Sequence, residues 1–305
     1  MITAAALSEH PLTTNAVGEC VGHLLERIGT GPTFVFVAVT TPHVGALEDI
    51  VATVRSVLNP QVVVGCVGSS LVGGPTEVEQ RAAVTMFACT APTLTSTVVP
   101  VRLELGADPA GLRGIDSLAG ASGTLLLVGE MSTAASSRLI AQLAAVAPDL
   151  RVVGGVTTCV HVAGPPRLAL DDRVYRQGAV GVRFPNGADV QSVVSHGGAP
   201  FGGPWTVTSS SGHWLQELAG RPAVERLVDT FGPAAAHDLV DRGQLAVGVA
   251  PGLGAAEPEP NDFVLHPVVS VADSGDSIVL SSAVETGATV RWFIRNPTTV
   301  SADLR

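Results

Sequence analysis

The chain has 305 residues, of which 46% are hydrophobic and 14% charged, and its formal net charge is −10. This composition is typical of a globular protein with a substantial core and excludes a disordered chain. All 17 basic residues are arginine, so Schiff-base, P-loop and other lysine-dependent chemistries are excluded. Because the arginines form no basic run, we expect no nucleic-acid partner.

The ends and the cysteines indicate the compartment. The N-terminus lacks the charged and apolar regions of a signal peptide, and no apolar run approaches the roughly 18 residues of a membrane span. We therefore expect a cytoplasmic protein without membrane insertion. The four cysteines, Cys20, Cys66, Cys89 and Cys159, have no CxxC spacing. This pattern favours reduced thiols over disulfides or a metal site.

The first part of the chain alternates helix and strand patterns. Apolar residues at helical spacing predict amphipathic helices over 14–28 and 44–58. Continuous apolar runs predict strands at 33–39, 62–67 and 83–87. A linking strand is expected within 94–105, followed by a weak helical pattern at 108–118.

A second set of elements repeats the first. Strands are predicted at 124–129, 152–156 and 179–184, with a helical stripe formed by Leu139, Leu143 and Val146. Gly65 and Gly154, which we expect to end the two middle strands, lie 89 positions apart (154 − 65). This spacing is too long for a solenoid repeat. We therefore predict a duplicated α/β unit whose copies pack face to face around a shared crevice.

Beyond residue 184 the pattern becomes richer in strands. Short strand-like runs are predicted at 190–195, 205–208, 244–249, 263–271, 277–280 and 289–294. A helix is expected to begin near Arg221-Pro222. The sequence thus predicts an α/β fold with a duplicated α/β domain at 1–184, packed with a mixed, β-richer α/β domain at 185–305.

Two glycine-bearing turns are candidates for a ligand site. Glycines allow close backbone approach and expose N–H groups, and neighbouring hydroxyls add donors. The first turn contributes Gly65, Cys66, Gly68, Ser69 and Ser70, and its mate contributes Gly155, Thr157, Thr158, Cys159 and His161. The alternatives are a tight turn with a buried apolar cysteine, and a strand edge leading into a surface turn.

A third candidate is the turn that holds His196 and Gly197. A histidine followed by glycines can contact a ligand or bind haem, although a lone turn histidine is usually solvated. No HExxH, nucleophile elbow, GxGxxG helix opening or P-loop is present. We therefore assign no catalytic residue, no metal ligand and no obligatory cofactor.

The motifs resemble those of FIST-domain proteins over nearly the whole chain. The resemblance to the N-terminal half is carried by Val64-Gly65-Cys66, Gly73-Gly74, Glu77-Val78-Glu79 and Ala83-Val84, and Gly178-Ala179-Val180-Gly181-Val182 is similar to the segment that joins the two halves. The resemblance to the C-terminal half is carried by Ser195-x-Gly197-x-x-Pro200-x-Gly202, Val207-Thr208 and Glu217-Leu218-x-Gly220-Arg221-Pro222-Ala223. It implies a bacterial, intracellular sensory module for signal transduction, which binds small ligands such as amino acids.

The chain departs from that family pattern in two places. The family usually has Gln, Cys and Arg where this chain has His196, Gly198 and Ala199, so an arginine that could anchor an anion is missing. The family also continues beyond the strand at 289–294, so we expect a fragment or a natural short form with an incomplete C-terminal half. A lost strand would expose a sheet edge and favour a homo-oligomer.

The functional expectation is a non-enzymatic sensor that holds a small polar, amino-acid-like ligand and signals to a partner protein. A haem-binding nitric-oxide sensor is the second hypothesis, implied by some members of the resembled family. A hydrolase or transferase that uses Cys66 or Cys159 is the third.

Overall fold

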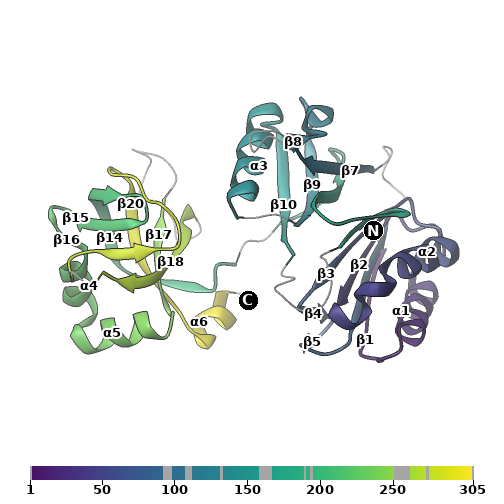
Figure 1. Cartoon of the computed structure of the whole chain (residues 1–305), viewed down its shortest axis with the longest axis horizontal. Helices are drawn as coiled ribbons and strands as arrows, with labels where there is room; N and C mark the ends of the chain where they lie inside the picture. Colours follow the sequence, from purple (N-terminus) through teal and green to yellow (C-terminus); the bar gives the residue numbers. More distant parts are fainter. Residues whose placement is uncertain are drawn as a thin grey trace. The chain divides into compact units, whose positions relative to one another are not determined.

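The computed structural model describes residues 2–91, 98–106, 112–130, 133–157, 167–188, 190–192, 195–250, 262–272 and 275–303. Its contacts divide the chain into two compact units, residues 1–192 and 193–305, and each unit is described by itself (Figure 1). The first unit is α/β and the second is mostly β, so the mixed α/β fold class is confirmed. The division falls after Ser192 rather than after Phe184, because Ala188 and Val190 still pack on the core of the first unit.

The first sheet of unit 1 has six strands in the order β1-β6-β2-β3-β11-β12. These are β1 (Ile2–Ser8), β6 (Val84–Thr90), β2 (Phe34–Thr40), β3 (Val62–Gly68), β11 (Leu168–Leu170) and β12 (Arg173–Tyr175). Helices α1 (Thr13–Ile28) and α2 (Leu47–Leu58) cover one face, and the 3-10 turn η1 (Thr41–Ala46) leads into α2. Their buried stripes form one core with every second residue of β2, β3 and β6.

The second sheet of unit 1 has five strands in the order β10-β9-β13-β7-β8. These are β10 (Leu150–Val156), β9 (Gly123–Glu130), β13 (Gly178–Phe184), β7 (Val99–Leu105) and β8 (Leu112–Arg113). Helix α3 (Thr133–Val146) and the 3-10 turn η2 (Ile115–Leu118) pack on one face. Of the weak helical pattern predicted at 108–118, the described part is a strand at Leu112–Arg113, which pairs with β7, and a 3-10 turn at Ile115–Leu118.

The two sheets share one arrangement of strands. In the first, β2 and β3 are parallel and joined through α2, and β6 lies antiparallel on the other side of β2. In the second, β9 and β10 are parallel and joined through α3, and β13 lies antiparallel on the other side of β9. This match supports the predicted duplication, which stays a prediction.

The inner faces of the two sheets pack against each other. Phe34, Val64 and Cys66 of the first sheet and Val128 and Val182 of the second belong to one buried core. The hairpin of β4 (Ser70–Gly73) and β5 (Thr76–Glu79) adds Leu71 and Val78 to that core. Unit 1 thus has four layers: helices, sheet, sheet and helix (Figure 1).

A hairpin crosses from one half of unit 1 to the sheet of the other. The β11–β12 hairpin follows β10 in the chain, yet β11 pairs antiparallel with β3, with Ala169 opposite Gly65. At its tip the Asp171 carboxylate accepts hydrogen bonds from Arg55 of α2 at 3.0 Å and from the Val63 amide at 3.1 Å. The hairpin is therefore fixed to both a strand and a helix of the first sheet.

Two arginines hold the base of the crossing hairpin. Arg167, just before β11, forms an ion pair with Glu48 of α2. Arg102 of β7 lies 4.2 Å from the ring centroid of Tyr175 and donates to the carbonyls of Gln177 and Ala179. Burial lowers the pKa of Arg102, and hydrogen bonds to carbonyls together with stacking on an aromatic ring offset part of the cost of burying the guanidinium.

Unit 2 is a closed antiparallel barrel. Its strands are β14 (Gly198–Ser211), β20 (Thr289–Arg295), β17 (Leu245–Val249), β18 (Val264–Val271), β19 (Ile278–Leu280) and β15 (Trp214–Leu218), and β16 (Arg221–Pro222) extends β15. The ring closes because the long strand β14 pairs with both β20 and β15. Helices α4 (Ala223–Phe231) and α5 (Pro233–Asp241) join its core, and α6 (Pro297–Asp303) follows β20.

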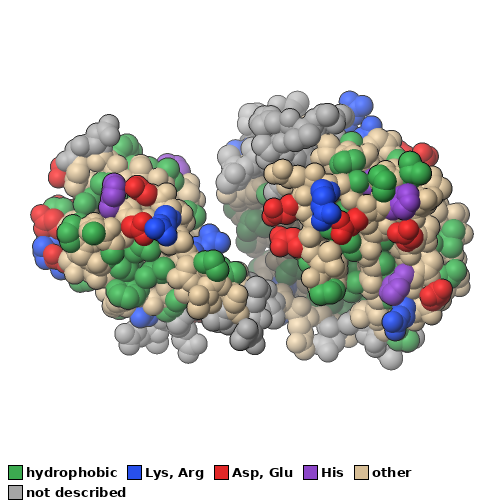
Figure 2. All heavy atoms as spheres, turned by 90° about the horizontal axis from the view of Figure 1, so that it is seen from below, with side chains coloured by type: hydrophobic (Ala, Val, Ile, Leu, Met, Phe, Trp, Pro, Cys, Tyr) green, Lys and Arg blue, Asp and Glu red, His purple; other side chains and the backbone are tan. Residues whose placement is uncertain are grey.

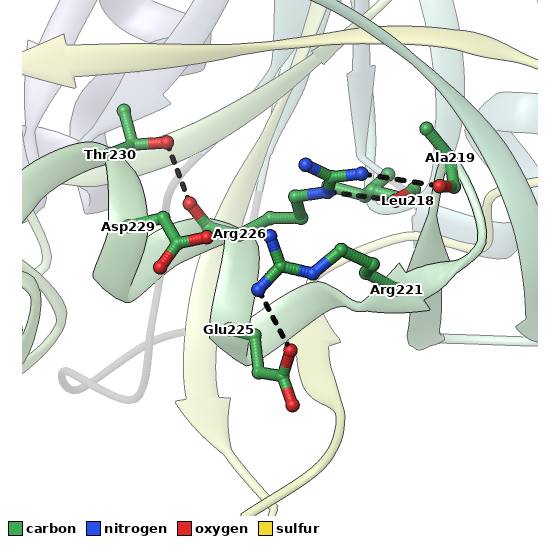
Figure 3. Close-up of polar contacts among 7 residues, drawn as sticks. All are labelled: Leu218, Ala219, Arg221, Glu225, Arg226, Asp229 and Thr230. Carbon is green, nitrogen blue, oxygen red and sulfur yellow. Dashed lines mark hydrogen bonds and ion pairs between the residues drawn. The ribbon is translucent and has the colours of Figure 1, made fainter.

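Figure 3 shows how the Glu-Leu-x-Gly-Arg-Pro-Ala segment turns from β15 into α4. Arg226 donates to the carbonyls of Leu218 and Ala219 at 3.1 and 3.2 Å, so it ties the helix to the turn before it. Arg221 pairs with Glu225 at 3.0 Å and with Asp229 at 2.8 Å on the same helix. The most specific motif of the chain therefore has a structural role here.

Several elements were missed or wrong in the sequence analysis. The strand β1 and the helix α6 were not predicted, because short Ala- and Thr-rich segments carry little periodic signal. Residues 190–192 and 195 are not in a strand, contrary to the prediction. No helix in the described part of the chain has the length and apolar character needed to span a membrane.

Gly154 provides a test of the β9–β10 packing. Its φ is +139°, and a Cβ there would lie 1.8 Å from the Leu127 carbonyl oxygen. We expect Gly154→Ala to lower the free energy of unfolding by about 2–4 kcal/mol, since it combines backbone strain with overpacking. Denaturant unfolding measures the change.

The neighbouring glycine is the matched control. A Cβ at Gly155 meets no atom within 4 Å, and its φ is not positive. Gly155→Ala should leave stability unchanged or raise it by up to about 1 kcal/mol. Equal losses for the two variants would contradict the described course of β10.

Candidate functional site

Two adjoining cavities open between the sheets of unit 1. The first, called the mouth, has a volume of about 290 Å³. It is lined by Phe36, Ala38, Cys66, Val67, Gly68, Ser70, Leu71, Val72, Thr85, Val128, Gly155, Val156 and Thr157. The mouth therefore combines residues from both halves of the predicted repeat, at the carboxyl ends of β3 and β10.

The second cavity, called the chamber, has a volume of about 520 Å³. It is lined by Phe34, Phe36, Phe87, Cys89, Leu126, Val128, Val153, Gly154, Gly155, Phe184, Val190 and Gln191. Phe36, Val128 and Gly155 line both cavities. The mouth and the chamber together form what we call the crevice, and each volume lies near or within the range of small-ligand sites.

Cys66 lies on the crevice side of β3. Side chains alternate along a strand, and Val62, Val64 and Cys66 contribute to the core between the sheets, whereas Val63 and Val67 face the helices. The Cys66 residue is 9% exposed. The predicted position of this thiol at the crevice therefore agrees with the geometry.

The sequence predicted that Gly65 lies in a turn, and this prediction was wrong. It lies in the middle of β3, paired with Val37 on one side and Ala169 on the other. A Cβ at this position would point towards Leu47 of α2 and lie 3.1 Å from the Ala169 Cβ. Gly65 therefore gives space to the helix layer, and its backbone is part of a sheet on both sides.

The first predicted turn begins later, at Gly68. Gly68 and Ser70 line the mouth, whereas Ser69 is exposed between β3 and β4 and its carbonyl accepts the Gln80 amide at 3.4 Å. Strand β3 extends to Gly68 because its pairing with β2 continues to Thr40 opposite Gly68, while β11 flanks its other side at Val64–Cys66. A strand with two partners tolerates a glycine that would end an isolated one.

The second predicted turn contributes Gly155 and Thr157 to the mouth. The Thr157 amide donates to the Gly129 carbonyl at 2.8 Å, and its hydroxyl donates to the Glu130 carboxylate. Glu130 ends β9 and was missed by the sequence analysis, because a single acidic residue after an apolar strand carries no distinctive pattern. Thr158, Cys159 and His161 lie outside the described residues.

The third candidate lies in the other unit. His196 and Gly197 precede β14, and the Gly197 carbonyl accepts the Thr299 hydroxyl at 3.0 Å. A Cβ at Gly197 would lie 2.9 Å from Val300 of α6. The glycine therefore has a packing role within unit 2.

The described thiols are reduced and buried. Cys20, Cys66 and Cys89 are buried, and none of them is in a disulfide. Burial raises the pKa of Cys89 and raises that of Cys20 to about 12, which disfavours the thiolate that nucleophilic chemistry requires. Within the described ranges no group of three or more His, Cys, Asp or Glu residues could hold a metal ion.

Electrostatics distinguish the crevice from the outer surface. No arginine or histidine is among the described residues that line the mouth or the chamber. On the face drawn in Figure 2, by contrast, acidic and basic side chains lie interspersed. The described lining of the crevice therefore presents thiol, hydroxyl and backbone groups and apolar walls, without a cation to neutralise an anion.

Unit 2 contains a cavity of its own. It has a volume of about 580 Å³ and lies against Leu227 of α4, Ala236 of α5 and Val269 of β18. His237 and Asp241, which pair at 3.1 Å on exposed turns of α5, reach its rim. No residue selected from the sequence lines this cavity, so the crevice in unit 1 is the stronger candidate.

Cys20 provides a test of the thiol environment. The folded state raises its pKa from 9.0 to about 12, so the folded state holds the proton more tightly than the unfolded chain. This contribution is complete below pH 9 and is lost as pH rises towards 12. The stability difference between wild type and Cys20→Ala should therefore shrink by roughly 1.4 kcal/mol between pH 8 and pH 10. Denaturant unfolding at both pH values measures it, and a constant difference would contradict the burial.

Comparison with known proteins gives the family. The FIST N domain matches residues 33–221. An uncharacterized protein of Mycobacterium tuberculosis is 32% identical over 309 residues, covering 100% of this chain and 79% of the relative. An uncharacterized protein of Mycobacterium bovis is 30% identical over 300 residues, covering 97% of this chain and 76% of the relative. The chain therefore belongs to the FIST domain family.

Proposed function

We propose that this chain is a sensory module that binds a small ligand in the crevice and passes the bound state to a partner protein. The FIST family is associated with sensory signal transduction and small-ligand binding. The observation that carries the proposal is the mouth, where Cys66 and Ser70 of the first half lie with Gly155 and Thr157 of the second. A ligand there touches both sheets at once.

The proposed signal is a change in the spacing of the two sheets. A ligand bound to β3 and β10 together stabilises the arrangement in which both strands reach it. The bound state then differs from the free state at surfaces remote from the mouth, and a partner that prefers one state senses the ligand. We place this module in the cytoplasm and propose no cofactor for it.

Binding is proposed rather than catalysis for a chemical reason. The crevice thiol of Cys89 is kept protonated by burial, and no histidine lines the described crevice to activate Cys66. A thiol nucleophile needs such a base or a lowered pKa. The hydroxyl of Thr157, held by Glu130, instead provides an oriented polar group for recognition.

A thermal-shift screen with the twenty amino acids, their decarboxylated amines and their aromatic and acyl amides, and with haem as a separate sample, tests the proposal. At about 100 times its dissociation constant, a ligand of the folded state stabilises by roughly 2.7 kcal/mol. We expect at least one compound to raise Tm, and Thr157→Val to remove most of that increase because the oriented hydroxyl is lost. Thr53→Val is the matched control, since Thr53 lies on α2 and bonds only its own helix at Asp49.

Two outcomes would contradict the proposal. One is a Tm increase that Thr157→Val leaves intact, since the ligand would then bind elsewhere. The other is a Soret band in the purified chain with haem, which would favour a haem protein instead.

A further inference from the structure

The chamber is too apolar for a wholly polar ligand. Four phenylalanines line it, namely Phe34, Phe36, Phe87 and Phe184, together with aliphatic side chains of β9 and β10. Phe87 is 39% exposed, although large aromatic side chains are usually buried when a partner surface is present. The walls therefore favour an apolar body.

Most polar side chains of the crevice line the mouth, whereas the chamber has Gln191 and the Cys89 thiol among its described lining. In the mouth the Thr157 hydroxyl lies beside the Glu130 carboxylate, and Ser70 and Thr85 add hydroxyls. No cation lines the described crevice. A bound carboxylate, sulfonate or phosphate would lose its hydration without an opposite charge. A neutral or cationic hydrogen-bond donor would instead donate to the Thr157 hydroxyl oxygen, whose own proton goes to the Glu130 carboxylate.

We propose that the crevice selects an amphipathic ligand, with an aromatic or acyl body in the chamber and a neutral or cationic donor head in the mouth. This inference rests on the proposed ligand-binding function and specifies the class of ligand. It replaces the small polar, amino-acid-like ligand of the sequence analysis, because a free amino acid brings a carboxylate into a crevice without a described cation.

Gly155 controls the passage between the mouth and the chamber. It lines both cavities and lies opposite Val128 in the parallel register of β9 and β10. Positions 153 and 155 of β10, and position 157 just after it, lie on the same face, because side chains alternate along a strand. A side chain introduced at position 155 would therefore point into the crevice. No atom lies within 4 Å of the position of its Cβ. Gly155→Phe should therefore fill the crevice without disturbing the sheet.

Two fluorescent probes with one skeleton test the inference. N-phenyl-1-naphthylamine is neutral and carries one N–H donor, and 8-anilinonaphthalene-1-sulfonate adds a sulfonate to the same rings. Fluorescence titration of the intact chain at pH 7 gives both dissociation constants. We expect the neutral probe to bind at least tenfold more tightly than the anionic probe.

Variants localise the probe. Gly155→Phe should weaken binding of the neutral probe at least tenfold, whereas Gly18→Phe should not, because Gly18 lies on α1 with no atom within 4 Å of its Cβ position. Phe87→Arg places a cation on the half-exposed wall of the chamber. The affinity for the anionic probe should therefore rise at least tenfold relative to the affinity for the neutral probe. This second variant keeps the test decisive if Gly155→Phe fails to fold.

The failures are distinguishable. Equal affinity for the two probes, or neutral-probe binding that survives both variants unchanged, overturns the amphipathic ligand class. A second result would also overturn the amphipathic ligand class: an amino acid stabilises the chain in a way that depends on Thr157, and the neutral probe does not bind. The proposed sensory function would then still stand. Loss of small-molecule stabilisation of every kind overturns both.

Discussion

The pairing of β11 with β3 is the constraint on which the first unit depends. It places three residues from the second half of the chain, Leu168–Leu170, inside the sheet of the first half. Asp171 then binds the backbone of Val63 and the side chain of Arg55. Because the hairpin between β10 and β13 must reach the opposite sheet, the inner faces of the two sheets are held together. The inner faces of the two sheets do not pack fully against each other near the ends of β3 and β10, and the crevice lies there.

The two walls of the crevice differ in how firmly they are held. Strand β3 has partners on both sides, β2 and β11, so its backbone groups are used and Cys66 is fixed. Among the described strands β10 has a partner only on one side, β9. An edge strand opens at a lower free energy than a central one. A ligand that touches both walls would therefore order the weaker wall against the firmer one, as the proposed sensory function requires.

Local periodicity predicted most of unit 1 but not its connections. The strands around Val35, Val64, Val128 and Val153 were found because apolar runs of strand length are unambiguous beside amphipathic helices. The crossing β11–β12 hairpin was not predicted. Leu168 pairs with Cys66, and a contact between residues so far apart in the sequence leaves no local pattern. For the same reason Gly65 was mistaken for a turn residue. Cys66, Ser70, Gly155 and Thr157, which we expected at one crevice, all line the mouth. The closed barrel of unit 2 was not predicted either. The ring closes because β14 pairs with β20 along one edge and with β15 along the other, and neither pairing leaves a local sequence pattern.

Hydrogen exchange of the β3 amides tests the central claim most directly. If β11 and Asp171 cover the outer edge of β3, amides from Val63 to Cys66 should exchange only through global unfolding, whereas the outward-facing amides of β10 should exchange faster. Fast exchange along one side of β3, at the rate seen in β10, would mean that the hairpin does not cross between the sheets. The crevice would then lack the contact that holds its walls together.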